Sequence, residues 1–202
     1  MTLVSLARKA RHVVPGVAAV ILVTLATGCS AGCSASVSIG HKKTGGTYSG
    51  HGVSLTIPDG WSRLESTTTK AQTGNQVWSE AFSRQSSIDL VSITAYATKF
   101  SITRENVDKF AANAAAAVKS LFESAGGSLV GGPDTTTLGG MAGYRFETTT
   151  PDENGKALDS IVYMVWNGQT EYFFNCQHQA SGSQKAEVER GCKKITSSFR
   201  VT

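Results

Sequence analysis

Apolar residues alternate with polar residues in two short stretches of the chain, and a third stretch is rich in β-branched side chains. Residues 53–57 show a period of two and end in the turn formed by residues 58–60, Pro-Asp-Gly. Residues 76–84 alternate in the same way, and residues 88–96 carry the β-branched run. Each pattern is typical of a β-strand. Because the connections are short, the three stretches predict an antiparallel meander.

The period then changes to three or four residues, which is typical of an amphipathic helix. Thr103 can cap this helix, and Glu105 is favourably placed in its first turn. Gly126 and Gly127 end it. We expect its apolar stripe to cover a sheet. The stripe consists of Val107, Phe110, Ala111, Ala114, Val118, Leu121 and Phe122.

Strand patterns return after this helix, separated by turn signals. The glycine-rich residues 138–143 predict a turn, because neither a helix start nor a P-loop lysine follows them. Residues 152–155 and the pair Asn167-Gly168 predict two hairpins. A second helix is expected from about Ser183 to Ser198. The predicted strands cover residues 128–130, 135–138, 143–149, 160–166 and 171–177.

Two cysteines near the C-terminus are predicted to face the same core. Cys176 lies on the apolar face of the last predicted strand, and Cys192 on the apolar face of the final helix. In an exported protein this pair implies a disulfide. It would close a loop of 192 − 176 = 16 positions and stabilise the fold by about 3 kcal/mol. The alternatives are a metal pair with His178 or a redox-active thiol, although the spacing fits neither a zinc site nor C-x-x-C.

Three segments resemble landmarks of a known domain family. They are residues 52–61 (GVSLTIPDGW), residues 137–144 (TLGGMAGY) and residues 195–199 (ITSSF). With the element order β-β-β-α-β-β-β-β-α, they resemble the PsbP/Mog1-like domain, and more closely the actinobacterial lipoproteins of the LpqN/LpqT type. The resemblance covers about residues 48–202.

This resemblance implies an α+β fold in which an antiparallel β-sheet is flanked by two main helices as an α/β/α sandwich. It also implies a binding or assembly module that works outside the cytoplasm. The family has no catalytic signature to carry over onto these positions. The pair Cys176 and Cys192 is extra to the family pattern.

A basic and apolar leader precedes the predicted domain. Arg8, Lys9 and Arg11 come before an apolar run at residues 17–26 (VAAVILVTLA), as in a signal peptide. A membrane-spanning helix needs roughly 20 apolar residues, and this run is shorter. The alternative is an uncleaved anchor or a core helix.

The residues after this run resemble a bacterial lipobox. Thr27 and Gly28 are small residues before Cys29, whose sulfur would receive a diacylglycerol before cleavage of residues 1–28. Two acyl chains are enough for stable retention on a membrane. Cys33, which follows a glycine, is a second candidate. Residues 29–47 are rich in Ser and Gly and predict a flexible tether, in which a short basic cluster could touch anionic headgroups or simply be solvated.

Length, composition and charge agree with a single exported domain. The 202 residues suffice for one domain at residues 48–202 plus the leader and the tether. The charged fraction of 17% and the hydrophobic fraction of 40% are ordinary for a globular protein. The formal charge of +4 includes three basic residues of the leader, which leaves 4 − 3 = +1. This charge does not indicate a nucleic-acid partner.

Motifs for catalysis, metals or cofactors give little support to an enzyme. The sequence contains no H-E-x-x-H, EF-hand loop or Walker motif. Residues 28–32 match G-x-S-x-G at Ser30, but that motif requires a strand before it and a helix after it. His51 and His178 are lone histidines and are expected to be surface or hydrogen-bonded imidazoles. We therefore expect no enzyme activity, no metal and no cofactor.

Three tryptophans are the candidate binding-surface aromatics. Trp61, Trp78 and Trp166 would fit either sheet packing or a recognition surface, and packing is expected for two of them. The sequence thus predicts a lipoprotein on the extracytoplasmic face of the cell membrane, with a protein partner in the cell envelope. A carrier of a small apolar ligand or lipid is the alternative. A hydrolase is the third hypothesis and requires a nucleophile hydrogen-bonded to His51 or His178.

Overall fold

The computed structural model describes residues 45–64, 75–84 and 88–202, and the described residues form an α+β fold. The predicted leader lies outside them. The strands are β1 (Gly46–Gly50), β2 (Val53–Ile57), β3 (Ser62–Arg63), β4 (Gln76–Ser83), β5 (Leu90–Ile102), β6 (Ser128–Leu138), β7 (Met141–Pro151), β8 (Ala157–Gln179) and β9 (Arg200–Val201). The helices are a 3-10 turn (Val107–Phe110), α1 (Ala111–Ser124) and α2 (Lys185–Ser198).

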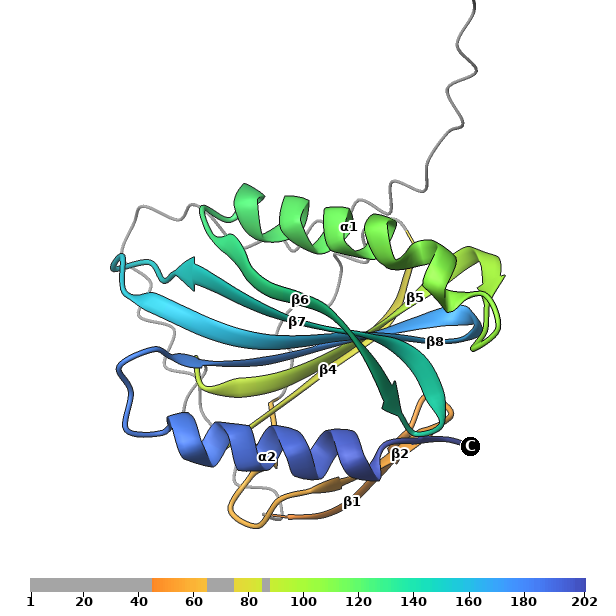
Figure 1. Ribbon diagram of the computed structural model, residues 1–202. Helices are drawn as coiled ribbons and strands as arrows, with labels where there is room; N and C mark the ends of the chain where they lie inside the picture. The colour runs from red at the N-terminus through yellow and green to blue at the C-terminus, as the bar shows by residue number, and fades with distance from the viewer. Residues whose placement is uncertain (1–44, 65–74, 85–87) are drawn as a thin grey trace, which may run out of the picture.

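The main sheet is antiparallel, with the strand order β3-β4-β5-β8-β7-β6. β8 takes two adjacent places in it, because the strand reverses direction at Asn167-Gly168. Its first half pairs with β7 and its second half with β5. Ala180 N donates to Ala157 O at 2.9 Å, so the two ends of the run meet. Gly168 has a φ of 62° at the reversal, and Figure 1 shows the chain turning back there. The predicted hairpin is confirmed.

A second, three-stranded sheet has the order β1-β2-β9, and it corrects one prediction. β4 and β5 pair as the meander requires, but β2 pairs with β1 and β9 instead of β4. The sequence pattern did not reveal the neighbours of β2. β1 reads GTYSG, with one large apolar side chain, and β9 has two residues. β1 also begins at Gly46, inside the predicted tether.

Helices cover both faces of the main sheet (Figure 1). Ala114, Val118 and Phe122 of α1 are buried against one face, as the apolar stripe predicted. α2 buries Val188, Cys192 and Ile195 against the other face, together with the small sheet. Buried side chains form a hydrophobic core between each helix and the sheet. Within the described residues, neither helix is long and apolar enough to cross a membrane.

The two ends of the first helical segment differ in how well the sequence predicted them. Lys109 N donates to Asn106 O, three residues earlier, at 3.1 Å, so the 3-10 turn comes first and α1 begins at Ala111. The Thr103 hydroxyl donates to Glu105 Oε2 and does not cap the helix. Gly126 ends the helix as predicted, with a φ of 76° that favours glycine.

α2 packs closely at Gly191 against Trp61, which lies between β2 and β3. Gly191 is buried, and a Cβ atom at position 191 would lie 2.3 Å from Trp61 Cζ2. Trp61 is almost fully buried, and its indole N–H has no hydrogen-bond partner among the described residues. The tryptophan ring therefore fills the space that the missing side chain of Gly191 leaves free.

We predict that Gly191→Ala destabilises the fold. In an exposed helix interior the same change would stabilise it by about 1 kcal/mol. Here the added methyl group would overlap the Trp61 ring, and such overpacking costs about 1–3 kcal/mol. Urea unfolding measures the difference, with Lys193→Ala on the exposed side of α2 as the control. A Gly191→Ala protein as stable as the wild type would show that the helix does not depend on this contact.

Candidate functional site

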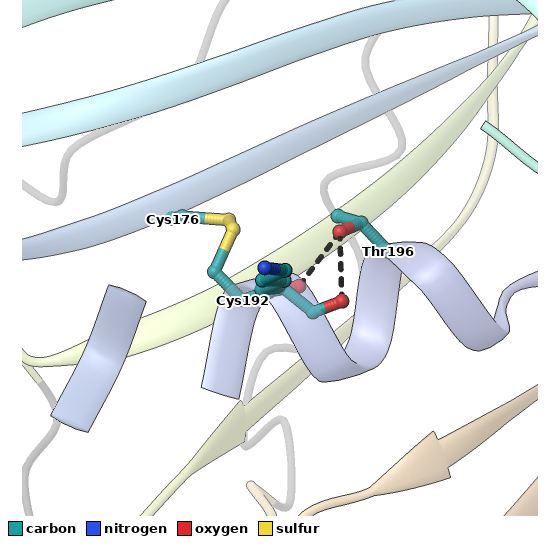
Figure 2. Close-up of a disulfide and its surroundings, with 4 residues drawn as sticks. Cys176, Cys192 and Thr196 are labelled. Carbon is teal, nitrogen blue, oxygen red and sulfur yellow. Dashed lines mark hydrogen bonds between the residues drawn. A yellow bond between two sulfur atoms is a disulfide. The ribbon is translucent and has the colours of Figure 1, made fainter. Parts of the chain in front are cut away.

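The predicted cysteine pair is present as a disulfide. Cys176 and Cys192 are joined with an S–S distance of 2.00 Å and a Cα–Cα distance of 5.8 Å, and both residues are buried. Figure 2 shows the bond linking β8 to α2. One turn along the helix, the Thr196 hydroxyl donates to Cys192 O at 2.8 Å. The disulfide therefore fixes α2 on the sheet. The predicted lipidation site Cys29 and the second candidate Cys33 lie outside the described residues.

The three candidate tryptophans are all buried, whereas packing was predicted for two of them. Trp61 and Trp78 belong to the core under α2, and Trp166 belongs to the core under α1. The sheet is covered by a helix on each face, so large rings on its strands are buried on either side. A recognition surface must therefore be built from other side chains.

A polar cluster around Glu80 joins the small sheet to the main sheet. Glu80 lies on β4, and its side chain is 4% exposed. Tyr48 of β1 donates to Glu80 Oε1 at 3.0 Å, and His51 Nε2 lies 3.2 Å from the same oxygen. Arg63 of β3 donates through Nη2 to Oε1 at 2.6 Å and through Nε to Oε2. One buried carboxylate thus binds three side chains from three neighbouring segments.

Aromatic rings complete this cluster, which we call the Glu80 cluster and define as Tyr48, His51, Arg63, Trp78 and Glu80. The His51 ring stacks on Trp78 with a centroid distance of 5.1 Å and an interplanar angle of 11°. Arg63 lies over the Tyr48 ring at 5.9 Å. His51 has a φ of 54°, in the tight turn between β1 and β2. The turn conformation and the stacking together fix the position of an imidazole that is 45% exposed.

The electrostatics of the Glu80 cluster keep its tyrosine protonated. Burial, with the negative charge of Glu80 beside it, raises the pKa of Tyr48 to about 12. The phenol is therefore a hydrogen-bond donor at all physiological pH values. Arg63 keeps its charge at any such pH, and its side chain is 55% exposed. The cluster presents a cation, a phenol and an imidazole in fixed positions at the surface.

The contacts of the two histidines differ from those of a catalytic base with a nucleophile. His51 contacts the Glu80 carboxylate, and His178 Nδ1 lies 3.1 Å from the carbonyl of Gln179. A hydroxyl or thiol nucleophile would have to form a hydrogen bond with the imidazole. In the described part of the chain, no group of three or more His, Cys, Asp or Glu residues could hold a metal ion.

A second buried carboxyl lies under α1, and its surroundings are apolar. Glu171 of β8 is 6% exposed, and its Oε2 accepts a hydrogen bond from Trp166 Nε1 at 3.1 Å. Its Oε1 has no partner among the described residues. Burial raises the pKa of Glu171 to about 7. The neighbouring Tyr96, paired with Glu171 across β5 and β8, has its pKa raised to about 12 by burial and by the charge of Glu171.

Sequence reasoning did not identify either carboxyl as a site. The available signal was an acidic residue on an otherwise apolar strand face. Glu80 lies between Trp78 and Phe82 on one face of β4, and Glu171 precedes Phe173 on one face of β8. Such a residue must be paired or protonated when it is buried.

The fold can be compared with the folds of known proteins. The antiparallel sheet with helices on both faces is an α+β fold of the PsbP-like type. Similar solved structures include PsbP (CyanoP) from the cyanobacterium Synechocystis, with a TM-score of 0.54 and 15% identity over 79% of this chain and 93% of that chain. LpqN of Mycobacterium tuberculosis, described as involved in cell envelope biogenesis, has a TM-score of 0.50 and 16% identity over 80% and 87%.

A third similar structure comes from Bacteroides thetaiotaomicron, with a TM-score of 0.44 and 14% identity over 75% of this chain. The chain spans 45% of the length of that protein. No protein-family model and no curated protein matches the sequence. At these identities the likeness shows the fold alone.

We predict that Glu171→Gln changes how stability depends on pH. Glu171 has a pKa of about 7 in the folded protein, against an ordinary value of 4.5. Between these two pH values the folded state keeps a proton on Glu171 that the unfolded state releases. The free energy of unfolding therefore falls as pH rises from about 4.5 to about 7, and Glu171 has no further effect on it at higher pH. The loss amounts to about 3 kcal/mol.

Urea unfolding between pH 4.5 and pH 8 would measure this effect. Glu171→Gln should match the wild type at the acidic end and exceed its stability by about 3 kcal/mol at the basic end. The exposed Glu123→Gln on α1 is the control and should follow the wild-type curve. Parallel curves for wild type and Glu171→Gln would contradict the raised pKa.

Proposed function

We propose that this chain is a lipid-anchored binding or assembly module of the cell envelope, held on the extracytoplasmic face of the membrane. The observation that carries the proposal is the buried Cys176–Cys192 disulfide in a chain whose leader ends at a lipobox-like cysteine. Structural disulfides persist in oxidising compartments outside the cytoplasm. The leader and the disulfide are therefore two independent observations that support a location outside the cytoplasm.

The Glu80 cluster supports a binding role. Arginine and tyrosine are enriched among the residues that dominate protein interfaces. Arg63 and Tyr48 are held by the same buried carboxylate, and His51 is stacked on a buried ring. Side chains that are already fixed lose little conformational entropy when a partner binds. A partner with an acidic or carbonyl-rich surface would fit the exposed guanidinium of Arg63.

The fold comparison is compatible with this role. LpqN, which shares the fold at 16% identity, is described as involved in cell envelope biogenesis. That description concerns LpqN itself. For this chain it supports the proposal that the PsbP-like fold can serve as an envelope module.

Mass spectrometry of the cell-associated protein tests the anchor. In a bacterium that processes lipoproteins, the mature chain should begin at Cys29 and carry a diacylglycerol on its sulfur, because the lipobox-like residues 27–29 direct both steps. Cys29→Ser should lose the cleavage and the lipid mass together, whereas Cys33→Ser should keep both. An unmodified Cys29 on cell-associated protein would refute the anchor.

Site-specific photo-cross-linking on intact cells tests the binding surface. A photoreactive residue in place of His51, whose side chain is 45% exposed in the Glu80 cluster, should give a discrete adduct with an envelope protein. Arg63→Glu in the same chain should abolish the adduct, because it reverses the charge that the partner contacts. The same probe at Asn113, exposed on α1, is the matched control. Equal adducts at both positions, or an adduct indifferent to Arg63→Glu, would show that the Glu80 cluster is not the binding surface.

A further inference from the structure

The outward face of α2 carries a concentration of positive charge. Val188, Cys192 and Ile195 face the sheet. Lys193 and Lys194 are exposed, lie more than a quarter turn away from that buried stripe and therefore point outward. Arg200 follows the helix and is exposed in β9. We call Lys193, Lys194 and Arg200 the α2 basic surface.

The acidic residues nearby offset little of this charge. The Glu187 carboxylate forms ion pairs with Arg84 and Arg190, each with an N–O distance of 3.0 Å. Glu189 lies at the margin of the outward face, one turn before Lys193. Lys193 and Lys194 form no ion pair with another described residue. On the opposite side of the molecule, Lys119 of α1 pairs with Glu123 at 3.7 Å.

Arg200 also offsets the partial negative charge at the end of the helix. Its Nη1 donates to Phe199 O at 2.6 Å and to Ser197 O at 3.0 Å. Carbonyl groups at a helix C-terminus otherwise repel anions. With these carbonyls bonded to a guanidinium, the last turn of α2 keeps a positive surface.

The α2 basic surface lies beside the point where the N-terminal chain enters the domain. Ser198 connects the last turn of α2 to β2. Its hydroxyl oxygen accepts a hydrogen bond from Thr56 N at 2.9 Å, and its hydroxyl group donates one to Lys194 O at 2.7 Å. Thr56 pairs with Thr47 across β1 and β2, and β1 begins one residue earlier, at Gly46. Figure 1 shows α2 and the small sheet on the same side of the main sheet. The last turn of α2 therefore lies about two strand spacings, ~10 Å, from the start of β1.

The length of the preceding chain sets how far the domain can move from its anchor. Cys29 and Gly45 are 45 − 29 = 16 positions apart. A Ser/Gly-rich chain of this length has a root-mean-square end-to-end distance of about 22 Å. An anchor at Cys29 would therefore hold the α2 basic surface within one domain diameter of the headgroups, at a high effective concentration.

We propose that the α2 basic surface binds anionic phospholipid headgroups of the membrane that holds the anchor. This inference rests on the proposed lipid anchor. Cations of α2 and β9 meet the headgroups, so that α2 faces the bilayer and α1 faces away from it. Each Lys or Arg near an anionic surface strengthens binding about five-fold, and salt weakens the attraction. The occupant is a lipid surface, whose negative charge complements three cations next to the tether.

Vesicle co-sedimentation of the unlipidated chain tests this proposal without depending on the anchor. Residues 29–202 with Cys29→Ser and Cys33→Ser are suitable, because the described helices, strands and both cores lie between residues 46 and 201. The probes are vesicles of phosphatidylcholine alone and vesicles with about one-third phosphatidylglycerol, at about 0.1 M and about 1 M salt. We expect binding to the anionic vesicles at low salt and none to the neutral ones.

A pair of charge-matched variants locates the surface. Lys193→Gln with Lys194→Gln should weaken binding at least about tenfold. Lys109→Gln with Lys119→Gln removes the same charge from the opposite side and should leave binding unchanged. All four residues are exposed, and circular dichroism checks that each variant is folded.

Three outcomes would overturn the inference. They are no binding to anionic vesicles, equal losses in the two double variants, or loss of the cross-link at position 51 in place of vesicle binding when Lys193 and Lys194 are changed. The last outcome would assign these cations to a protein partner. Lipidation of Cys29 together with absent vesicle binding would reject this inference alone, whereas vesicle binding with an unmodified Cys29 would support the basic surface and reject the proposed anchor.

Discussion

The packing of α2 against the main sheet, Trp61 and β2 is the constraint on which this side of the molecule depends. Three contacts hold the helix: the Cys176–Cys192 disulfide, the Trp61 ring against Gly191, and the Ser198 hydroxyl on the backbone of β2. Gly191 and Cys192 are adjacent near the middle of the helix, and Ser198 is its last residue. Because β9 follows α2 directly and pairs with β2, the position of the helix sets the position of the third strand of the small sheet. The start of β1 and the basic face of α2 are brought together by the same contacts.

The two buried carboxyls show how one fold treats buried charge in opposite ways. Glu80 is surrounded by donors from three segments and works as the acceptor that joins the two sheets. Glu171 has one donor, from Trp166, and its raised pKa follows from that apolar environment. A saturated carboxylate organises surface side chains, whereas an unsaturated one makes the core sensitive to pH. This difference is why the Glu80 cluster, and not Glu171, is the basis of the proposed binding surface.

The sequence predicted the parts of the fold that long periodic patterns encode. The stripes of α1 and α2, the turn at residues 138–143, the reversal at Asn167-Gly168 and the disulfide partners all follow from periods of 3.6 or two and from turn residues. The small sheet could not be predicted from the sequence. β1 has one large apolar side chain and β9 has two residues, and the pairing of both strands depends on tertiary contacts. The Glu80 cluster combines residues up to 32 positions apart, so no local pattern encodes it. The tryptophans were misjudged because ring type does not say which faces the helices cover.

The proposed function follows from location: we propose that the domain stands outside the membrane, with the Arg63 guanidinium on its surface and the α2 basic surface beside the start of β1. The most direct test of that claim is the oxidation state of Cys176 and Cys192 in living cells, measured by acid quenching, differential alkylation and mass spectrometry of the cell-associated protein. The account predicts that both sulfurs are protected from the first alkylating reagent and react only after reduction. Free thiols at both positions would contradict it, because the domain would then stand in a reducing compartment.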